Sequence, residues 1–245
     1  MRFFPKTPAL ITYVMAGDPD LAASEASLDA CLAGGADALE IGMPFTDPVA
    51  DGPTIQAAAA RALANRTTLR DVIDLSARMR RRTSVPIILM GYLNPILAMG
   101  VERFFGTCAS AGVSAVLVAD LPADHAVLLA ETAARANIAL PLLVAPTSDE
   151  ARIDRIAAAA TGFLYYVSVT GTTGVRRSLP PDLHKRLALV RSRTSLPLVV
   201  GFGIQSRDQI ETLAPHVDGV VVGSAIVERA GDARTLRSFV SSLVI

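Results

Sequence analysis

Eight short apolar runs recur along the chain, each separated from the next by a longer segment rich in alanine, leucine and arginine. Most of these runs do not alternate between apolar and polar residues, so we expect strands that are covered on both faces. The intervening segments often follow an Asp, Ser or Thr and end at a Gly or Asn, as capped helices do. The expected strands are 10–16, 38–42, 86–91, 115–120, 139–145, 163–169, 197–203 and 219–224.

Eight strand–helix units predict a parallel sheet closed into a (β/α)8 barrel, the TIM-barrel fold. The 245 residues, of which 51% are hydrophobic, suffice for one core, and we expect residues 1–245 to form a single domain. A doubly wound open sheet is the alternative. Such a sheet would normally use fewer strands and carry a GxGxxG turn after the first one, where this chain reads "MAGDPD".

Charge and cysteine content limit the kinds of partner. Basic and acidic residues balance at 23 each, which disfavours binding to nucleic acid or to an anionic membrane. The basic run "RMRRRTS" at 78–84 is interpreted as the end of a helix, where cations suit the helix dipole. No apolar stretch approaches the roughly 18 residues needed to span a bilayer. Cys31 and Cys108 lack metal-ligand spacing, and the amino-terminal residues do not read as a signal peptide, so we expect a soluble, cytoplasmic protein without a bound metal.

Active sites of such barrels lie at the carboxyl ends of the strands, and the second strand carries an unusual residue there. Glu40 lies within an apolar run, and Asp47 and Asp51 follow in the next loop. Glu40 is either a core carboxylate paired with a neighbouring donor or a general acid–base whose pKa is raised by apolar surroundings. Asp51 is a solvated residue, a helix N-cap, or a fixed anion facing a substrate N–H.

Glycines after the last two strands indicate a phosphate site. Gly203 and Gly223 would let the backbone approach an anion, and Ser224 adds a hydroxyl at the start of a helix. The alternative is that the glycines only permit tight turns. The loop at 170–178, "TGTTGVRRS", is either an exposed connector or a closing lid that adds the Gly174 N–H to the phosphate.

The chain resembles the tryptophan synthase alpha subunit family over almost its whole length. The most specific segment is "GADALEIGMPFTDPVADGPTIQ" at 35–56. Others are "GDPD" (17–20), "LNPI" (93–96), "VLVADLP" (116–122), "YYVSVTGTTG" (165–174), "GFGI" (201–204) and "GSAIV" (223–227). The resemblance implies reversible retro-aldol cleavage of indole-3-glycerol phosphate to indole and D-glyceraldehyde 3-phosphate, with neither a metal nor an organic cofactor in this chain.

The resemblance also implies roles for particular residues. Glu40 would shuttle protons, Asp51 would accept the indole N–H, and Tyr165 would help to place the glutamate and the substrate. The implied phosphate ligands are Gly174, Gly203, Gly223 and Ser224, and the implied indole pocket consists of Tyr13, Ile55, Met90, Leu117 and Phe202. Tyr13 stands where the family commonly has phenylalanine.

A partner is implied as well. The family's alpha subunit contacts a pyridoxal-phosphate-dependent beta subunit, which receives indole within an α2β2 heterotetramer. In this chain the matching contact residues are Pro44, Asp47, Asn94 and Pro122. Two alternatives stay open: a stand-alone lyase that releases free indole, and a non-catalytic subunit that regulates a beta partner. Indole-glycerol-phosphate synthase is disfavoured because it requires a site lysine, and Lys6 and Lys185 follow no expected strand.

Overall fold

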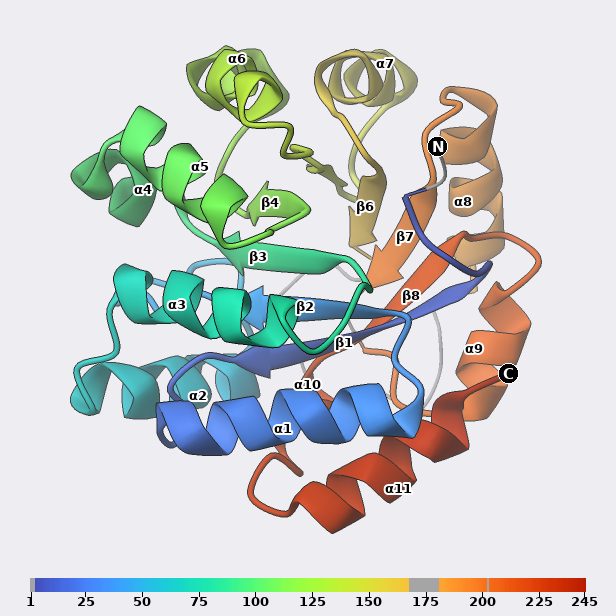
Figure 1. Cartoon of the computed structure of the whole chain (residues 1–245). Helices are drawn as coiled ribbons and strands as arrows, with labels where there is room; N and C mark the ends of the chain where they lie inside the picture. Colours follow the sequence, from blue (N-terminus) through green and yellow to red (C-terminus); the bar gives the residue numbers. More distant parts are fainter. Residues whose placement is uncertain (1–2, 168–180, 202) are drawn as a thin grey trace.

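The computed structural model describes residues 3–167, 181–201 and 203–245, and its eight parallel strands curve into a barrel (Figure 1). Neighbouring strands follow the order β4-β3-β2-β1-β8-β7-β6-β5. All eight expected strands are confirmed, with small differences at their ends. They are β1 Ala9–Met15, β2 Ala38–Gly42, β3 Ile87–Gly91, β4 Ala115–Val118, β5 Leu142–Val144, β6 Leu164–Val167, β7 Leu198–Gly201 and β8 Gly219–Val222.

Helices surround the strands on the outside of the barrel (Figure 1). Within the described ranges, no helix is both long enough and apolar enough to cross a bilayer. The helices are α1 Leu21–Gly34, α2 Pro53–Ala64, α3 Leu69–Arg80, α4 Leu93–Met99, α5 Val101–Ser110, the 3₁₀ turn η1 Ala123–His125, α6 Val127–Arg135, α7 Glu150–Ala159, α8 Leu183–Ser192, α9 Arg207–Leu213, α10 Ser224–Val227 and α11 Ala233–Leu243.

The barrel wall closes between β4 and β5 through a short contact instead of a full ladder. Ala115 and Ala139 form a parallel bridge, in which Val116 N–H donates to Ala139 O at 2.9 Å and Ala139 N–H donates to Ser114 O at 3.0 Å. The expected strand at 139–145 shrinks to β5 because Pro141 has no N–H to donate. The (β/α)8 barrel prediction is confirmed, and the doubly wound alternative is wrong.

Successive strand residues alternate between the barrel interior and the helical layer. Tyr13, Glu40 and Ile88 lie side by side in register on β1, β2 and β3, and the two apolar ones belong to the inner hydrophobic cluster. Their neighbours Leu39 and Ile41 belong to the outer cluster, beneath the helices. The alternation is invisible in the sequence because both faces are apolar, and it turns Glu40 toward the barrel axis.

Helix ends follow the expected chemistry. The Asp20 side chain accepts from Ala23 N at 2.8 Å at the start of α1, and Thr68 and Asp71 form a reciprocal capping box on α3. The basic run at 78–84 does end a helix. Its Arg78 Nε lies 2.7 Å from a carboxylate oxygen of Glu25 on α1, so this cation is paired within the fold.

Aromatic rings fill the amino-terminal end of the barrel. Phe3, Phe4 and Phe163 contact one another with ring centroids 4.9 to 5.4 Å apart. Phe4 and Phe163 are buried within the inner cluster. The same segment is tied to the carboxyl terminus, since Lys6 Nζ donates to Ile245 O at 2.9 Å. This end of the barrel is therefore closed by packing, away from the carboxyl ends of the strands.

We predict that Phe163→Ala lowers the free energy of unfolding by about 3–4 kcal/mol, because it removes a fully buried ring and leaves a cavity. Phe3→Ala, at a half-buried ring of the same cluster, is the matched control and should cost less. Urea unfolding followed by circular dichroism measures both. Equal losses for the two variants would contradict the link between the burial of the ring and its contribution to stability.

Candidate active site

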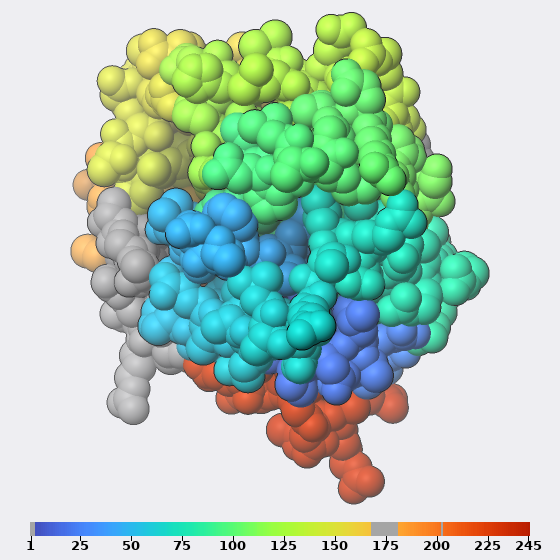
Figure 2. Space-filling model, turned by 90° about the vertical axis from the view of Figure 1, so that its left-hand side faces the viewer, coloured from blue at the N-terminus to red at the C-terminus, as the bar shows by residue number. Residues whose placement is uncertain are grey.

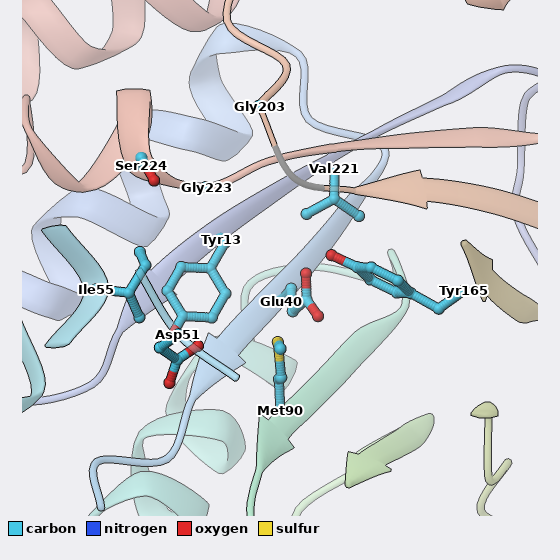
Figure 3. Close-up of a pocket in the computed structure, with 10 residues that line it drawn as sticks. All are labelled: Tyr13, Glu40, Asp51, Ile55, Met90, Tyr165, Gly203, Val221, Gly223 and Ser224. Carbon is cyan, nitrogen blue, oxygen red and sulfur yellow. The ribbon is translucent and has the colours of Figure 1, made fainter. Parts of the chain in front are cut away.

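A cavity opens at the carboxyl ends of the strands, where the molecular surface is hollowed beside the segment that follows β2 (Figure 2). The empty space within it, together with the open space at its mouth, amounts to about 400 Å³. The described residues that line it are Tyr13, Glu40, Asp51, Ile55, Met90, Tyr165, Gly203, Val221, Gly223 and Ser224 (Figure 3).

Glu40 projects from β2 into this cavity and is 1% exposed. Among the described residues, neither of its carboxyl oxygens has a hydrogen-bond partner. Burial, and then the charge of Asp51, raise the pKa of Glu40 to about 8. The alternative of a core carboxylate paired with a neighbouring donor is therefore wrong. At neutral pH the group is largely protonated, and it faces the space that a ligand would fill.

Asp51 enters the same cavity from the loop before α2 and is 7% exposed. One carboxyl oxygen, Oδ2, accepts a hydrogen bond from Tyr92 Oη at 2.9 Å. Burial raises the pKa of Asp51 to about 6, and the bond from Tyr92 opposes that rise. Asp51 is neither solvated nor an N-cap: the N-cap of α2 is Gly52, which makes no side-chain capping bond. Its carboxylate stays ionised at neutral pH, so the two acids occupy different protonation states.

Two tyrosine rings fit into the cavity wall because glycines stand beside them. A Cβ at Gly42 would lie 2.1 Å from Tyr13 Oη, and a Cβ at Gly201 would lie 2.0 Å from Tyr165 Oη. The Tyr165 hydroxyl points toward Glu40 in Figure 3. Burial is the largest cause that raises the pKa of both phenols, followed by Asp51 for Tyr13 and by Glu40 for Tyr165. Both side chains therefore remain protonated and able to donate.

The opposite side of the cavity is formed by the ends of β7 and β8. Gly203 has a left-handed backbone with φ of +84°, which a glycine adopts without strain. Gly223 precedes α10, whose first residue is Ser224, and all three line the cavity across from the carboxylates (Figure 3). The structure thus brings the glycines and the serine hydroxyl that follow β7 and β8 to one wall.

The other residues predicted from the sequence divide into three groups. Ile55 and Met90 line the cavity, whereas Leu117 packs in the inner cluster and is not one of the described lining residues. Gly174, Phe202 and the proposed lid at 170–178 lie outside the described residues.

Two residues of this region, Val221 and Tyr92, are not among those predicted from the sequence. Val221 is an inward-facing residue of β8, and the alternation along that strand identifies it once Gly219 is placed. Tyr92 directly follows the last residue of β3, so its position at the active edge of the barrel was a usable signal. Neither side chain is charged at neutral pH and neither residue is a glycine, so neither stands out in an apolar sequence.

Potential metal ligands do not gather here. Among the described parts of the chain, no group of three or more His, Cys, Asp or Glu side chains could hold a metal ion. Cys31 and Cys108 are buried free thiols on α1 and α5, as their apolar contexts predicted.

The residues expected to contact a partner lie around the rim of the cavity, on three segments: the loop between β2 and α2, helix α4, and the chain that follows β4. Asp47, Asn94 and Pro122 are exposed, and Pro44 is half-buried.

Large apolar side chains stand exposed on the same three segments: Val49 (77%), Leu97, Val127 (76%) and Leu128. The backbone N–H of Leu93, at the start of α4, donates to Asp120 Oδ1 at 2.8 Å after β4, which ties two of these segments together. Single exposed apolar residues are common on protein surfaces, whereas a contiguous apolar patch marks an interaction site.

Comparison with known proteins gives the family. A family model described as tryptophan synthase alpha chain matches residues 4–242. The chain belongs to the tryptophan synthase alpha chain family. A curated relative of that name from Geobacter sulfurreducens is 48% identical over 241 residues, which are 96% of this chain and 91% of the relative. Another, from Citrifermentans bemidjiense, is 51% identical over 220 residues, covering 90% and 82% of the two chains.

Solved structures agree with this membership. A chain from a structure of the tryptophan synthase α2β2 complex of Pyrococcus furiosus superposes with a TM-score of 0.91 at 38% identity, covering 97% of this chain and 98% of that one. A chain of Mycobacterium tuberculosis tryptophan synthase gives a TM-score of 0.90 at 34% identity, covering 97% and 91%. The resemblance found in the sequence is confirmed.

The raised pKa of Glu40 also predicts how the free energy of unfolding depends on pH. Its pKa is raised from 4.5 to about 8 in the folded chain, so the folded state binds more protons than the unfolded state between these values. Stability from this group is therefore greatest below about pH 4.5 and falls as the pH rises toward about 8. Glu40→Gln should be more stable than the wild type at pH 8, by a few kcal/mol, and should lose less stability between pH 5 and pH 8. Urea unfolding at the two pH values measures this, and equal pH dependence in both proteins would contradict it.

Proposed function

We propose that this chain cleaves indole-3-glycerol phosphate to indole and D-glyceraldehyde 3-phosphate, as the alpha component of a tryptophan synthase. The observation that carries the proposal is the pair of buried carboxyl groups in one cavity, with Glu40 protonated and Asp51 ionised at neutral pH. A reaction that must give a proton to one atom and stabilise positive charge on another requires such a pair.

The steps follow from those protonation states. Protonated Glu40 gives its proton to C3 of the indole ring, and the ring nitrogen becomes positively charged. The Asp51 carboxylate accepts the ring N–H and stabilises that charge, in a site where little water screens it. Glu40, now a carboxylate, takes the proton of the hydroxyl on the adjacent glycerol carbon. The carbon–carbon bond to C3 breaks, its electrons return to the ring, and an aldehyde forms. Glu40 ends protonated, ready for the next turnover.

The remaining lining residues would hold the two ends of the substrate. Tyr13, Ile55 and Met90 provide apolar and aromatic surface for the indole ring, and Tyr165 borders Glu40. Gly203, Gly223 and Ser224 would bind the phosphate from the opposite wall, through backbone N–H groups and the serine hydroxyl. Gly174, Phe202 and Leu117 complete the sets that the family resemblance implies.

We further propose that the rim is the docking face for a beta subunit. One of the structurally similar chains comes from a tryptophan synthase α2β2 complex. The face carries Pro44, Asp47, Asn94 and Pro122, with the exposed apolar side chains beside them. Asp51 belongs to the same β2–α2 loop as Asp47, so a partner that contacts the rim would touch the segment that carries the catalytic anion. The two buried free thiols favour a reducing compartment, and we assign the reaction to the cytoplasm.

Glu40→Gln should abolish cleavage while it leaves substrate affinity largely intact, since the amide keeps the shape of the side chain but cannot exchange a proton. The expected loss of turnover is at least about 100-fold, the usual contribution of a general acid–base. Indole release measured by absorbance, with binding of glyceraldehyde 3-phosphate as a folding control, tests this. Full activity in the variant would refute the proton-shuttle role.

Partner dependence separates the proposal from its two alternatives. Indole release by the purified chain alone should be slow and should rise strongly when a cognate beta subunit is added. Leu97→Asp should weaken that stimulation by about 10-fold or more by placing a charge in an apolar contact, whereas Ala188→Asp on α8 should not. Fast release without a partner would favour a stand-alone lyase, and no release in either condition would favour a regulatory subunit.

A further inference from the structure

Tyr92 forms a link between the β3–α4 junction and the catalytic loop after β2. It is 3% exposed and directly precedes α4. Its hydroxyl donates to Asp51 Oδ2 at 2.9 Å and accepts from the backbone N–H of Ala50 at 3.1 Å. Phe45 stacks on its ring, with centroids 5.2 Å apart. One phenol therefore contacts both the side chain of Asp51 and the backbone beside it.

We propose that Tyr92 is a positioning residue for catalysis: it holds Asp51 by Oδ2 and so leaves Oδ1 to accept the ring N–H of the substrate. This inference rests on the proposed function, because it specifies how one of the two carboxyl groups is aimed.

The backbone of Asp51 is already fixed without the help of Tyr92. Asp51 N–H donates to Pro48 O at 3.0 Å, and Gln56 Nε2 donates to Asp51 O at 2.8 Å. What the backbone bonds leave free is rotation of the carboxyl group about its side-chain torsions. The bond from Tyr92 to a single oxygen restrains that rotation. A catalytic group that is misplaced by about 1 Å can cost about 100-fold in rate, so this restraint matters for turnover.

Tyr92 itself is held firmly. Phe45 stacks on one face of its ring. The backbone N–H of the next residue, Leu93, donates to Asp120 Oδ1 at 2.8 Å. Tyr92 is therefore held by contacts from the segment that follows β2, and its neighbour Leu93 by a bond to the segment that follows β4. A side chain that is itself restrained is an effective donor, since it loses little freedom when the substrate binds.

The charges around Asp51 make this donor important. Among the described residues, the titratable groups that interact with it are Glu40 on β2, Tyr13 on β1, Tyr165 on β6 and Tyr92 after β3. All of them are acids, and none of the described lining residues is a lysine, arginine or histidine. Burial disfavours the Asp51 anion, and hydrogen bonding from Tyr92 favours it. Loss of the hydroxyl should therefore raise the pKa of Asp51 as well as release its carboxyl group.

A purely structural role for Tyr92 makes a different prediction. If the tyrosine served only to fix the loop through Ala50, its loss would lower activity by the same factor at every pH. A role in holding the Asp51 anion instead links the loss to the ionisation of Asp51. The deficit should then be greatest on the acid side of the pH–rate profile and should shrink as the pH rises.

The test compares Tyr92→Phe with the wild type and with Tyr166→Phe, which removes a buried hydroxyl from the outer face of β6. Indole release from indole-3-glycerol phosphate is measured from about pH 5 to about pH 9, the range that contains both raised carboxyl pKa values. For Tyr92→Phe we expect kcat to fall about 10-fold or more near pH 7, a change in KM of less than about threefold, and an acid limb displaced to higher pH. Tyr166→Phe should keep the wild-type profile.

Two further measurements make the outcome decisive. In an Asp51→Asn background, Tyr92→Phe should add little further loss, because the group that it positions is gone. If Tyr92→Phe does not fold, 3-fluorotyrosine at position 92, a more acidic donor of nearly the same shape, should displace the acid limb to lower pH. An unchanged acid limb, or losses that add in the double variant, would overturn the inference while leaving the proposed function in place. If the wild type cleaves no substrate with or without a partner, the proposed function fails, and this inference fails with it.

Discussion

A carboxyl group buried without a hydrogen-bond partner is the constraint on which this site depends. Parallel strands covered on both faces turn every second side chain toward the barrel axis, and at Glu40 that side chain is an acid. Nothing described in the wall donates to it, so the fold keeps it protonated instead of paying the larger cost of burying its charge. A nearby acid, Asp51, can then stay ionised because a phenol donates to it. The two acids differ in protonation state because no described group donates a hydrogen bond to Glu40, whereas Tyr92 donates one to Asp51.

Most of the fold could be predicted from the sequence because its signals are local. Apolar strands, helix-capping residues and glycines at turns recur along the chain, and each of these patterns predicts the element in which it lies. The errors occur where a single atom matters. Pro141 shortens β5 because it lacks one N–H, and the closure of the barrel then rests on the contact around Ala139. Periodicity does not register a single missing donor.

The residues of the candidate site could be predicted less completely than the fold, for two reasons. Acids and glycines stand out in an apolar sequence, and those after β2, β7 and β8 do gather around one cavity. Tyr92 does not stand out, because its importance lies in a distance to Asp51, 41 positions away in the sequence. Leu117 shows the opposite error: its position in the inner cluster follows from alternation, but the depth at which the cavity ends does not. Which inward residues are packed and which face the cavity depends on the whole barrel.

The glycines beside the two tyrosines have a consequence for how this pocket can change during evolution. Gly42 and Tyr13 occupy one space between β1 and β2, and Gly201 and Tyr165 occupy another between β6 and β7. A side chain added at either glycine would collide with the neighbouring phenol. Replacement of the tyrosine by a smaller residue, with the glycine kept, would instead leave an empty space. The order of substitutions therefore matters: replacing the tyrosine first opens the space that a side chain at the glycine would fill, whereas a side chain added first forces the phenol to shift. A change of substrate at this site is therefore coupled to a change at both members of each pair.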